Sequence, residues 1–326
     1  MRGTVLKFRG DRASAVAPHI FFHSFLIMQD KRLTEQQNPR STRIDILSSL
    51  EIVDLVNSED RTVALAVEKE RTAIARTIDL VVESFLAGGR LVYVGAGTSG
   101  RLGVLDAAEM PPTFGTDPDM VLGVIAGGVE ALVRAQEGAE DSRAHGAEAL
   151  ESIEVGPKDF VLGIATSGTT PFVHGGLEWA RKQGAKTGLL ICTYPTPEMT
   201  EDHDVVIAPL VGPEVITGST RMKAGTATKL VLNTISTAAM VRTGKVYGNL
   251  MVDLQVTCDK LQDRGERILE EVLGVQRDEA SALLDLADGS VKVAIVMGRQ
   301  GVKGEEAREM LNAADGVVSR VVVDLL

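Results

Sequence analysis

The sequence predicts an α/β protein with a doubly wound parallel sheet, N-terminal helices and a small C-terminal helical subdomain. Five short apolar runs alternate with segments of helical periodicity, a pattern typical of a parallel sheet with helices on both faces. Two turns rich in glycine and hydroxyl residues directly follow two of these apolar runs. After Gly274 the chain carries only short helical patterns.

The first thirty residues differ from the rest of the chain. An apolar stretch at 19–28 follows several basic residues, but it is too short to span a membrane. No small-residue cleavage site of a signal peptide comes after it. We therefore expect residues 1–30 to be an extension outside the fold. The alternative is a native start at Met28, in which case residues 1–27 would not belong to the protein.

Residues 31–90 are predicted to form helices that pack on the core. Apolar residues at helical spacing give one face between Ile46 and Leu55 and another between Ile74 and Phe85. A pair of glycines after the second pattern is a typical helix end, because glycine easily adopts the left-handed conformation found there.

Strands and helices alternate through residues 91–273. Ligands of such sheets bind beyond the carboxyl ends of the strands, which is where both glycine-hydroxyl turns are expected. The predicted strands are Leu91–Val94, Val121–Ala126, Phe160–Ala165, Thr187–Ile191 and Val205–Pro209. Helices are predicted near 100–109, 129–136, 142–151 and 171–183, followed by two long ones over 219–241 and 249–273.

Residues 274–326 are predicted to form the small helical subdomain, with three short helices. A segment of this length is small for an independent core. We therefore expect it to pack on the main domain or on another subunit.

Composition and charge exclude several classes of partner. The net charge is −11, and the chain has no basic stripe with interleaved aromatic residues, so we expect no nucleic-acid partner. No apolar run is long enough to predict a membrane partner. Cys192 and Cys258 stand far apart without metal or redox spacing, which is typical of a reducing cytoplasm. The histidines share no ligand spacing, so no metal site is expected.

The most informative turn runs from Gly95 to Arg101, between the first predicted strand and a predicted helix. Backbone N–H groups and the helix dipole would face an anion there, and the hydroxyls of Thr98 and Ser99 add donors. The spacing also matches the dinucleotide motif G-x-G-x-x-G, but the acidic residue that a nicotinamide site needs at the end of the next strand is missing. The turn therefore favours a phosphate group over a dinucleotide.

The second turn follows the third predicted strand and contains Ser167, Gly168, Thr169 and Thr170. Taken alone, it is typical of a well-capped helix with Thr170 as its N-cap. Two such turns, each between a parallel strand and a helix, favour a single phosphate ester over a pyrophosphate.

A third cluster, with Ser219, Arg221 and Lys223, lies at the predicted start of a long helix. An anionic ligand needs local positive charge against the negative field of the whole chain. Arg221 or Lys223 could supply that charge. Solvated charges in a first helical turn are an equally good interpretation of each.

Two glutamates are candidates for acid–base chemistry. Glu109 is predicted in the last turn of its helix, before two prolines that end it. That helix end disfavours negative charge, whereas Glu140 precedes or opens the next helix, where negative charge is favoured. One carboxyl biased toward the protonated form and one toward the ionised form make an acid–base pair. From the sequence alone, Glu137 and Asp141 compete with Glu140.

The motifs around these residues resemble those of the N-acetylmuramic acid 6-phosphate etherases. The resemblance extends from about Leu33 to the C-terminus, and residues 1–28 have no counterpart in it. It rests on five segments, Gly95–Gly103, Asp106–Gly115, Glu137–Asp141, Ser219–Thr226 and Gly244–Asp253.

This resemblance implies a sugar isomerase (SIS) domain that binds a sugar phosphate over residues 91–273. It implies a cytoplasmic homodimer with the site near the subunit interface. It further implies cleavage of the D-lactyl ether of N-acetylmuramate 6-phosphate to N-acetylglucosamine 6-phosphate and D-lactate, without a cofactor. The acid of the family maps onto Glu109 and its second catalytic glutamate onto Glu140.

Two other functions occur on the same scaffold. Glucokinase regulatory proteins bind sugar phosphates without catalysis, and sugar-phosphate isomerases act on related substrates. The two glutamates, and a chain shorter than regulators with two SIS domains, favour the etherase. Release of lactate separates the etherase from an isomerase.

Overall fold

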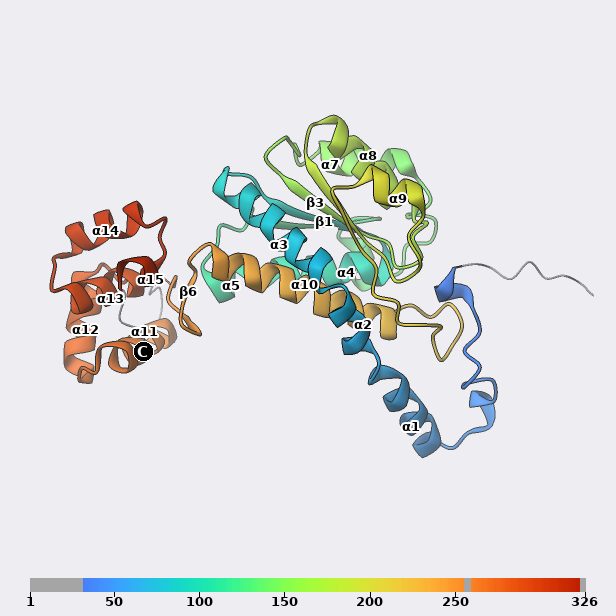
Figure 1. Ribbon diagram of the computed structural model, residues 1–326, viewed down its shortest axis with the longest axis horizontal. Coiled ribbons are helices and arrows are strands. Elements are labelled where there is room, and N and C mark those ends of the chain that lie inside the picture. The colour runs from blue at the N-terminus through green and yellow to red at the C-terminus, as the bar shows by residue number, and fades with distance from the viewer. Residues whose placement is uncertain (1–31, 255–258, 323–326) are drawn as a thin grey trace, which may run out of the picture.

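The computed structural model describes residues 32–254 and 259–322, so the predicted extension at 1–30 lies outside the described residues. Figure 1 shows an N-terminal arm that leaves the body at α1, a central sheet between helices, and a group of C-terminal helices to one side. Within the described ranges, no helix is both long and apolar enough to cross a membrane.

The central sheet has five parallel strands in the order β2-β1-β3-β4-β5. The direction of winding changes between β1 and β3, so their carboxyl ends form the crevice in which such sheets bind ligands. The parallel sheet predicted from the sequence is confirmed, with each predicted run forming a strand. The strands are β1 (Leu91–Gly95), β2 (Val121–Ile125), β3 (Phe160–Ile164), β4 (Lys186–Leu190) and β5 (Val205–Ile207).

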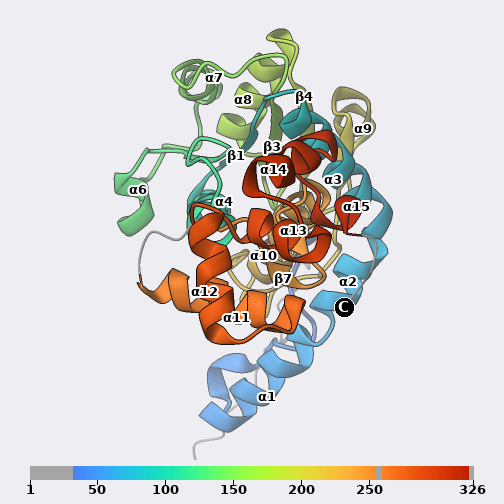
Figure 2. The same ribbon diagram turned by 90° about the vertical axis from the view of Figure 1, so that its left-hand side faces the viewer.

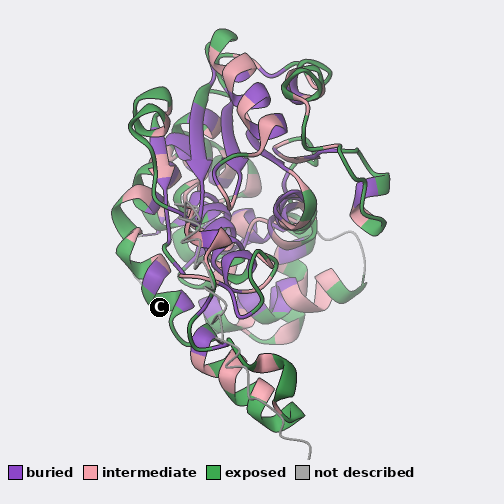
Figure 3. Cartoon of the chain, turned by 90° about the vertical axis from the view of Figure 1, so that its right-hand side faces the viewer, coloured by how far each residue is buried: buried purple, intermediate pink, exposed green. Residues whose placement is uncertain are grey.

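Each face of the sheet has its own apolar core, because successive strand residues point to opposite faces. Leu91 and Tyr93 pack on one face with α3, α4 and α10, whereas Val92 and Val94 pack on the other with α7 and α8. Figure 3 shows the buried strands between these layers. The covering helices are α3 (Arg71–Leu86), α4 (Gly97–Ala108), α7 (Arg143–Glu151), α8 (Pro171–Lys182) and α10 (Lys223–Arg242).

The N-terminal arm consists of two short 3-10 turns (Leu33–Glu35 and Ile44–Ile46), α1 (Ser49–Asp60) and α2 (Val63–Lys69). A capping box between Ser48 and Glu51 starts α1. Helix α1 extends away from the body (Figures 1 and 3), so its apolar side chains stay in contact with solvent. Leu50 and Val53 are 69% and 52% exposed.

The C-terminal helices form an apolar core of their own, separate from the two cores of the sheet, and it also includes the hairpin that follows α10. Leu269 of α11 is fully buried in this core, although the sequence grouped α11 with the sheet domain. Between Gly274 and Val322, the last described residue, the chain forms four helices instead of the predicted three. Figure 2 shows these C-terminal helices from the side on which they lie, in front of the sheet domain. The helices are α11 (Asp259–Leu273), α12 (Arg277–Leu286), α13 (Val291–Gln300), α14 (Gly304–Ala313) and α15 (Val318–Val321).

A β-hairpin replaces the start of the helix predicted over 249–273. Strands β6 (Val246–Tyr247) and β7 (Leu250–Met251) pair antiparallel, and the described part of helix α11 is Asp259–Leu273. Gly248 has a φ of 58°, a left-handed conformation that the two-residue turn between these strands requires and that glycine adopts without strain.

The remaining helices are α5 (Met110–Phe114), α6 (Glu130–Val133) and α9 (Pro197–Asp202). The prediction that Pro111 and Pro112 end a helix is wrong in detail. Both lie in the first turn of α5, where proline is tolerated because the first helical N–H groups need no helical acceptor. Glu109 is therefore the residue at the junction of α4 and α5.

Candidate functional site

A cavity of about 280 Å³ lies at the carboxyl ends of β1 and β3, where the two predicted turns meet. Thr98 and Ser99 line it from the first turn, and Ser167 and Thr170 line it from the second. Glu140 lines it from a third segment. The fold thus brings together predicted site residues from three separate parts of the chain.

The first turn is shaped by the close approach of α4 to β1. A Cβ on Gly95 would lie 2.8 Å from the backbone nitrogen of Gly100, and a Cβ on Gly100 would lie 2.6 Å from the side chain of Ile125. Helix α4 starts at Gly97, and no side chain caps its first turn. Its N-terminus therefore opens onto the cavity, where N–H groups and the helix dipole favour an anion.

The side chain of His174 contacts the backbone of the second turn. The ring Nε2 of His174 lies 2.8 Å from the carbonyl oxygen of Gly168, and the hydroxyls of Ser167 and Thr169 lie 3.1 Å apart. Thr170 is the N-cap residue of α8, but its hydroxyl makes no capping hydrogen bond. A second helix N-terminus therefore opens onto the same cavity, and two helix dipoles favour negative charge there.

Glu140 is held beside the second turn by the backbone. The N–H of Phe172, in the first turn of α8, donates to the carbonyl oxygen of Glu140 at 2.9 Å. Glu137 lines the adjoining cavities instead, and Asp141 lines none of the cavities around this loop. The geometry therefore favours Glu140 among the three carboxylates that compete in the sequence.

Glu109 does not line this cavity. Along α4, Glu109 lies ten positions after Ser99, the last residue of the first turn that lines the cavity, which at about 1.5 Å per residue is roughly 15 Å. Near that far end, Asn233 and Ser236 of α10 donate to Asp106 at 2.6 and 3.1 Å. Glu109 is exposed on the same helical face as Leu105, which is 52% exposed. Within one chain, Glu109 and Glu140 therefore do not meet.

The third cluster contributes to the cavity through its neutral residues. Gly218 and Thr220 line the cavity on either side of Ser219. Helix α10 starts only at Lys223, later than predicted. Neither Arg221, which is exposed, nor Lys223, which is buried, is among the described residues that line this cavity.

The charge of Lys223 is directed to Glu59. The two side chains are 2.5 Å apart and buried, and Arg40 lies 3.1 Å from the same carboxylate. Burial disfavours the charged form of Glu59, but the hydrogen bond and charge of Lys223 outweigh it and lower the pKa of Glu59. This ion pair joins the N-terminal arm to the start of α10.

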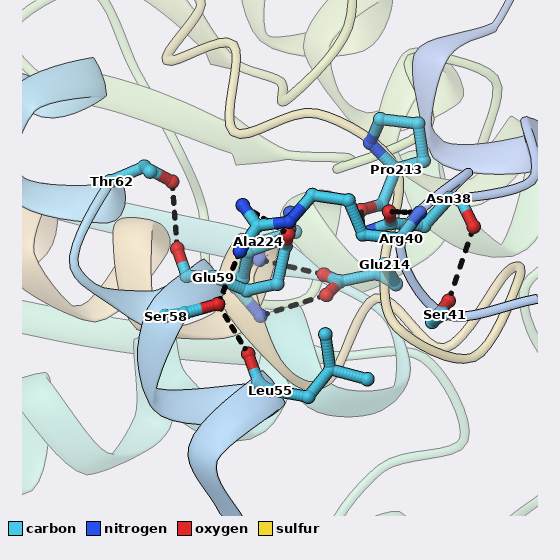
Figure 4. A network of polar contacts seen from close by, with 11 residues as sticks. Asn38, Arg40, Ser41, Leu55, Ser58, Glu59, Thr62, Pro213, Glu214 and Ala224 are labelled. Atoms are coloured by element: carbon cyan, nitrogen blue, oxygen red, sulfur yellow. Dashed lines mark hydrogen bonds and ion pairs between the residues drawn. The ribbon is translucent and has the colours of Figure 1, made fainter. Parts of the chain in front are cut away.

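A second buried carboxylate caps α10 in the same network (Figure 4). Glu214 accepts hydrogen bonds from the backbone N–H groups of Lys223 and Ala224 at 3.1 and 2.9 Å. Burial raises the pKa of Glu214. The network stabilises the loop that carries Gly218 and Thr220, so it supports one wall of the cavity.

Three polar residues of the cavity wall, Glu35, Thr166 and Thr220, were not predicted as binding residues. Thr166 belongs to the hydroxyl-rich second turn and Thr220 to the third cluster, so the sequence indicated their segments without selecting these two residues. Glu35 is far from both turns in the chain, and only the resemblance at its own segment could have drawn attention to it. Within 32–254 and 259–322, no three His, Cys, Asp or Glu side chains converge as a metal site would require.

The chain is similar to several known proteins. Residues 73–181 match the family model of the glucokinase regulatory protein N-terminal SIS domain. An N-acetylmuramic acid 6-phosphate etherase from Salinibacter ruber is 58% identical over 81% of this chain and 85% of its own length. Etherases of the same name from Clostridium botulinum and Synechococcus elongatus are 53% and 54% identical over 83% of this chain and 89% and 88% of their own lengths.

Among solved structures, a phosphoheptose isomerase from Neisseria gonorrhoeae covers 59% of this chain and 98% of its own, with 15% identity and a TM-score of 0.45. The assignment follows from the curated relatives, which exceed half identity over most of both sequences. The chain belongs to the N-acetylmuramic acid 6-phosphate etherase family.

Proposed function

We propose that this protein is a carbon–oxygen lyase that cleaves the D-lactyl ether of N-acetylmuramate 6-phosphate. The products are N-acetylglucosamine 6-phosphate and D-lactate. The observation that carries the proposal is the cavity in which two helix N-termini meet Glu140, in a chain 58% identical to an etherase. We place the reaction in the cytoplasm, because the composition and the buried free thiol of Cys192 suit a reducing compartment.

The phosphate of the substrate would bind at the two helix N-termini. Thr98, Ser99, Ser167 and Thr170 supply hydroxyl donors there, together with the first N–H groups of α4 and α8. None of the described residues that line the cavity is a lysine or an arginine. Hydrogen bonds and helix dipoles at these turns would hold the phosphate, and the anchored phosphate keeps the intermediate in place.

Glu140 is proposed as the base. In the open-chain sugar, the aldehyde at C1 acidifies the proton at C2, and the carboxylate of Glu140 removes it. The C3–oxygen bond then breaks and lactate departs with a proton supplied by Glu109, which leaves an unsaturated aldehyde. Water adds at C3, a proton returns to C2, and the sum is ether plus water to alcohol plus lactate.

The position of Glu109 supports a homodimer in which each copy completes the cavity of the other. Glu109 lies a helix length from the cavity of its own chain, and it is exposed beside exposed Leu105. Exposed apolar side chains on α1 provide further surface that a second copy would cover. A closed pair with two-fold symmetry would repeat the same contact twice.

The test is release of D-lactate from N-acetylmuramate 6-phosphate by the purified protein, measured with a lactate-specific dehydrogenase. The match to a regulatory SIS domain at 73–181 favours a sugar-phosphate-binding regulator as the second candidate. A regulator would bind the substrate without releasing lactate, and an isomerase would convert a sugar phosphate without producing lactate. Either result would contradict the proposed function.

A further inference from the structure

Two hydrogen bonds connect the start of the N-terminal arm to segments near the cavity. The backbone N–H of Leu33 donates to the hydroxyl of Thr193 at 3.1 Å. The side-chain amide of Asn38 donates to the carbonyl oxygen of Pro213 at 3.2 Å. One of these anchors follows β4, and the other lies on the loop that leads to the third cluster. The residues between them are therefore held against the site.

Glu35 lies between the two anchors, and it lines the cavity. A Cβ on Gly218 would lie 3.5 Å from Oε2 of Glu35, so the carboxylate is close to the backbone of a glycine in the cavity wall. The hydroxyl of Thr34, a residue only 1% exposed, donates to Oε1 of Glu35 at 3.2 Å. The carboxylate is therefore held in place by a buried neighbour.

The carboxylate of Glu35 is suited to contact a neutral hydrogen-bond donor of the ligand. Ionised carboxylates only accept hydrogen bonds, and they repel phosphate, which the two helix N-termini attract. The substrate class offers two kinds of neutral donor, the hydroxyl groups of the sugar and the N–H of its acetamido group. Either donor would form a charge-assisted hydrogen bond with Glu35.

We propose that Glu35 is a substrate-binding residue that accepts a hydrogen bond from one of these neutral donors. This contact, together with the phosphate turns, orients the sugar so that C2 faces Glu140. The inference rests on the proposed function for the identity of the sugar. It assigns Glu35 to binding and orientation, and leaves the proton transfers to Glu140 and Glu109.

The test compares Glu35→Ala and Glu35→Gln with Gln36→Ala in the full-length protein. Gln36 is the next residue in the same segment, and it does not line the cavity. For Glu35→Ala we expect KM for N-acetylmuramate 6-phosphate and the inhibition constant of N-acetylglucosamine 6-phosphate to rise about 10- to 100-fold, as for loss of a hydrogen bond to a charged group. Glu35→Gln keeps an acceptor oxygen and should fall between wild type and Glu35→Ala.

Inorganic phosphate is the internal control, because it has neither hydroxyl nor acetamido donors on a sugar. Its inhibition constant should not rise in any variant. Unchanged sugar binding in Glu35→Ala, or equal weakening of sugar and phosphate binding, would overturn the inference. A loss of kcat with unchanged sugar affinity would overturn it as well, since it would make Glu35 a proton-transfer group. Failure of the wild type to release lactate would instead contradict the proposed function itself.

Discussion

The two ends of helix α4 carry different parts of the proposed chemistry. Its N-terminus forms the first of the two turns proposed to bind phosphate, beside Glu140, and Glu109 lies at its C-terminal end. If the base and the acid act at different steps, their removal should have different effects. Proton exchange at C2 needs only the base, whereas loss of lactate needs both groups.

We expect Glu140→Gln to abolish exchange of the C2 proton of N-acetylglucosamine 6-phosphate with deuterated water and to lower lactate release by about 10²- to 10⁴-fold. Glu109→Gln should lose lactate release and keep the exchange. Both quantities can be followed by proton NMR, with Glu137→Gln as the matched control because Glu137 does not line the cavity. Exchange at the wild-type rate in Glu140→Gln would show that another group is the base.

At the scale of single residues, local sequence patterns were enough to predict the cavity residues that directly follow strands. Thr98, Ser99, Ser167 and Thr170 could be predicted because a strand, a turn and a helix start occur within a few residues of one another. Glu35 could not, because its place depends on anchors to segments far away in the chain.

Local sequence patterns do not show which charged side chains belong to the site. Lys223 and Arg221 are equivalent in the sequence, and only the packing of the arm directs the ammonium of Lys223 to Glu59. The choice of Glu140 over its acidic neighbours likewise depends on its backbone contact with Phe172. These distinctions require tertiary contacts that no periodicity encodes.

At the scale of elements, the two turns proposed to bind phosphate are the N-termini of two helices, and each should contribute separately to binding. Ser99→Ala and Ser167→Ala should each weaken binding of a sugar phosphate by about 1–3 kcal/mol, the range for a hydrogen bond to a charged group. Calorimetric titration with N-acetylglucosamine 6-phosphate measures this, with Ser49→Ala on the exposed arm as the control. Equal affinity of the wild type for phosphorylated and unphosphorylated sugars would refute the phosphate assignment.

Strands β1 and β3 are joined at their starts by Arg90 and Asp159. The carboxylate of Asp159 accepts bonds from the Arg90 backbone at 2.8 Å and from its guanidinium at 2.8 and 3.2 Å. Burial disfavours the charged form of Asp159, but these bonds and that of Gly156 outweigh it and lower the pKa of Asp159. Because the folded-state pKa is depressed, this stabilisation is present above the unfolded pKa and is lost as pH falls through the folded pKa.

Asp159→Asn should therefore lower the free energy of unfolding at pH 7 by about 2–3 kcal/mol. The difference from wild type should shrink below pH 4, because the wild type then loses the same charge. Urea titrations at several pH values measure both effects. Glu83→Gln is the control, since Glu83 is exposed and its ion pair with Arg76 spans 4.0 Å. A difference that does not change with pH would contradict the ionic origin of the effect.

The elements themselves were predicted best where apolar periodicity is strong. All strands of the sheet were located, because their runs are short, apolar and bounded by turns. The hairpin at Val246–Met251 was missed, because its strands are too short to show alternation. The prolines after Glu109 were interpreted as a helix end, because proline has the same preference for a helix start.

At the scale of the whole molecule, the separation of Glu109 from its own cavity predicts shared active sites. Glu109→Gln and Glu140→Gln should each be inactive, and mixing them under conditions that exchange subunits should restore activity. Half of the dimers would be mixed, and one of the two sites in each would have both glutamates, so about a quarter of wild-type activity is expected. The rate of lactate release measures this recovery. No recovery, with subunit exchange verified by a tagged copy, would mean that both glutamates act within one chain.

The central claim is that water enters the sugar after lactate has been eliminated, and isotope labelling tests it most directly. N-acetylmuramate 6-phosphate is incubated with the protein in water that contains both deuterium and oxygen-18, and both products are examined by mass spectrometry and NMR. We expect deuterium at C2 and oxygen-18 at C3 of N-acetylglucosamine 6-phosphate, and lactate that keeps its original ether oxygen. Oxygen-18 at the former ether position of lactate, or sugar without deuterium at C2, would contradict the claim.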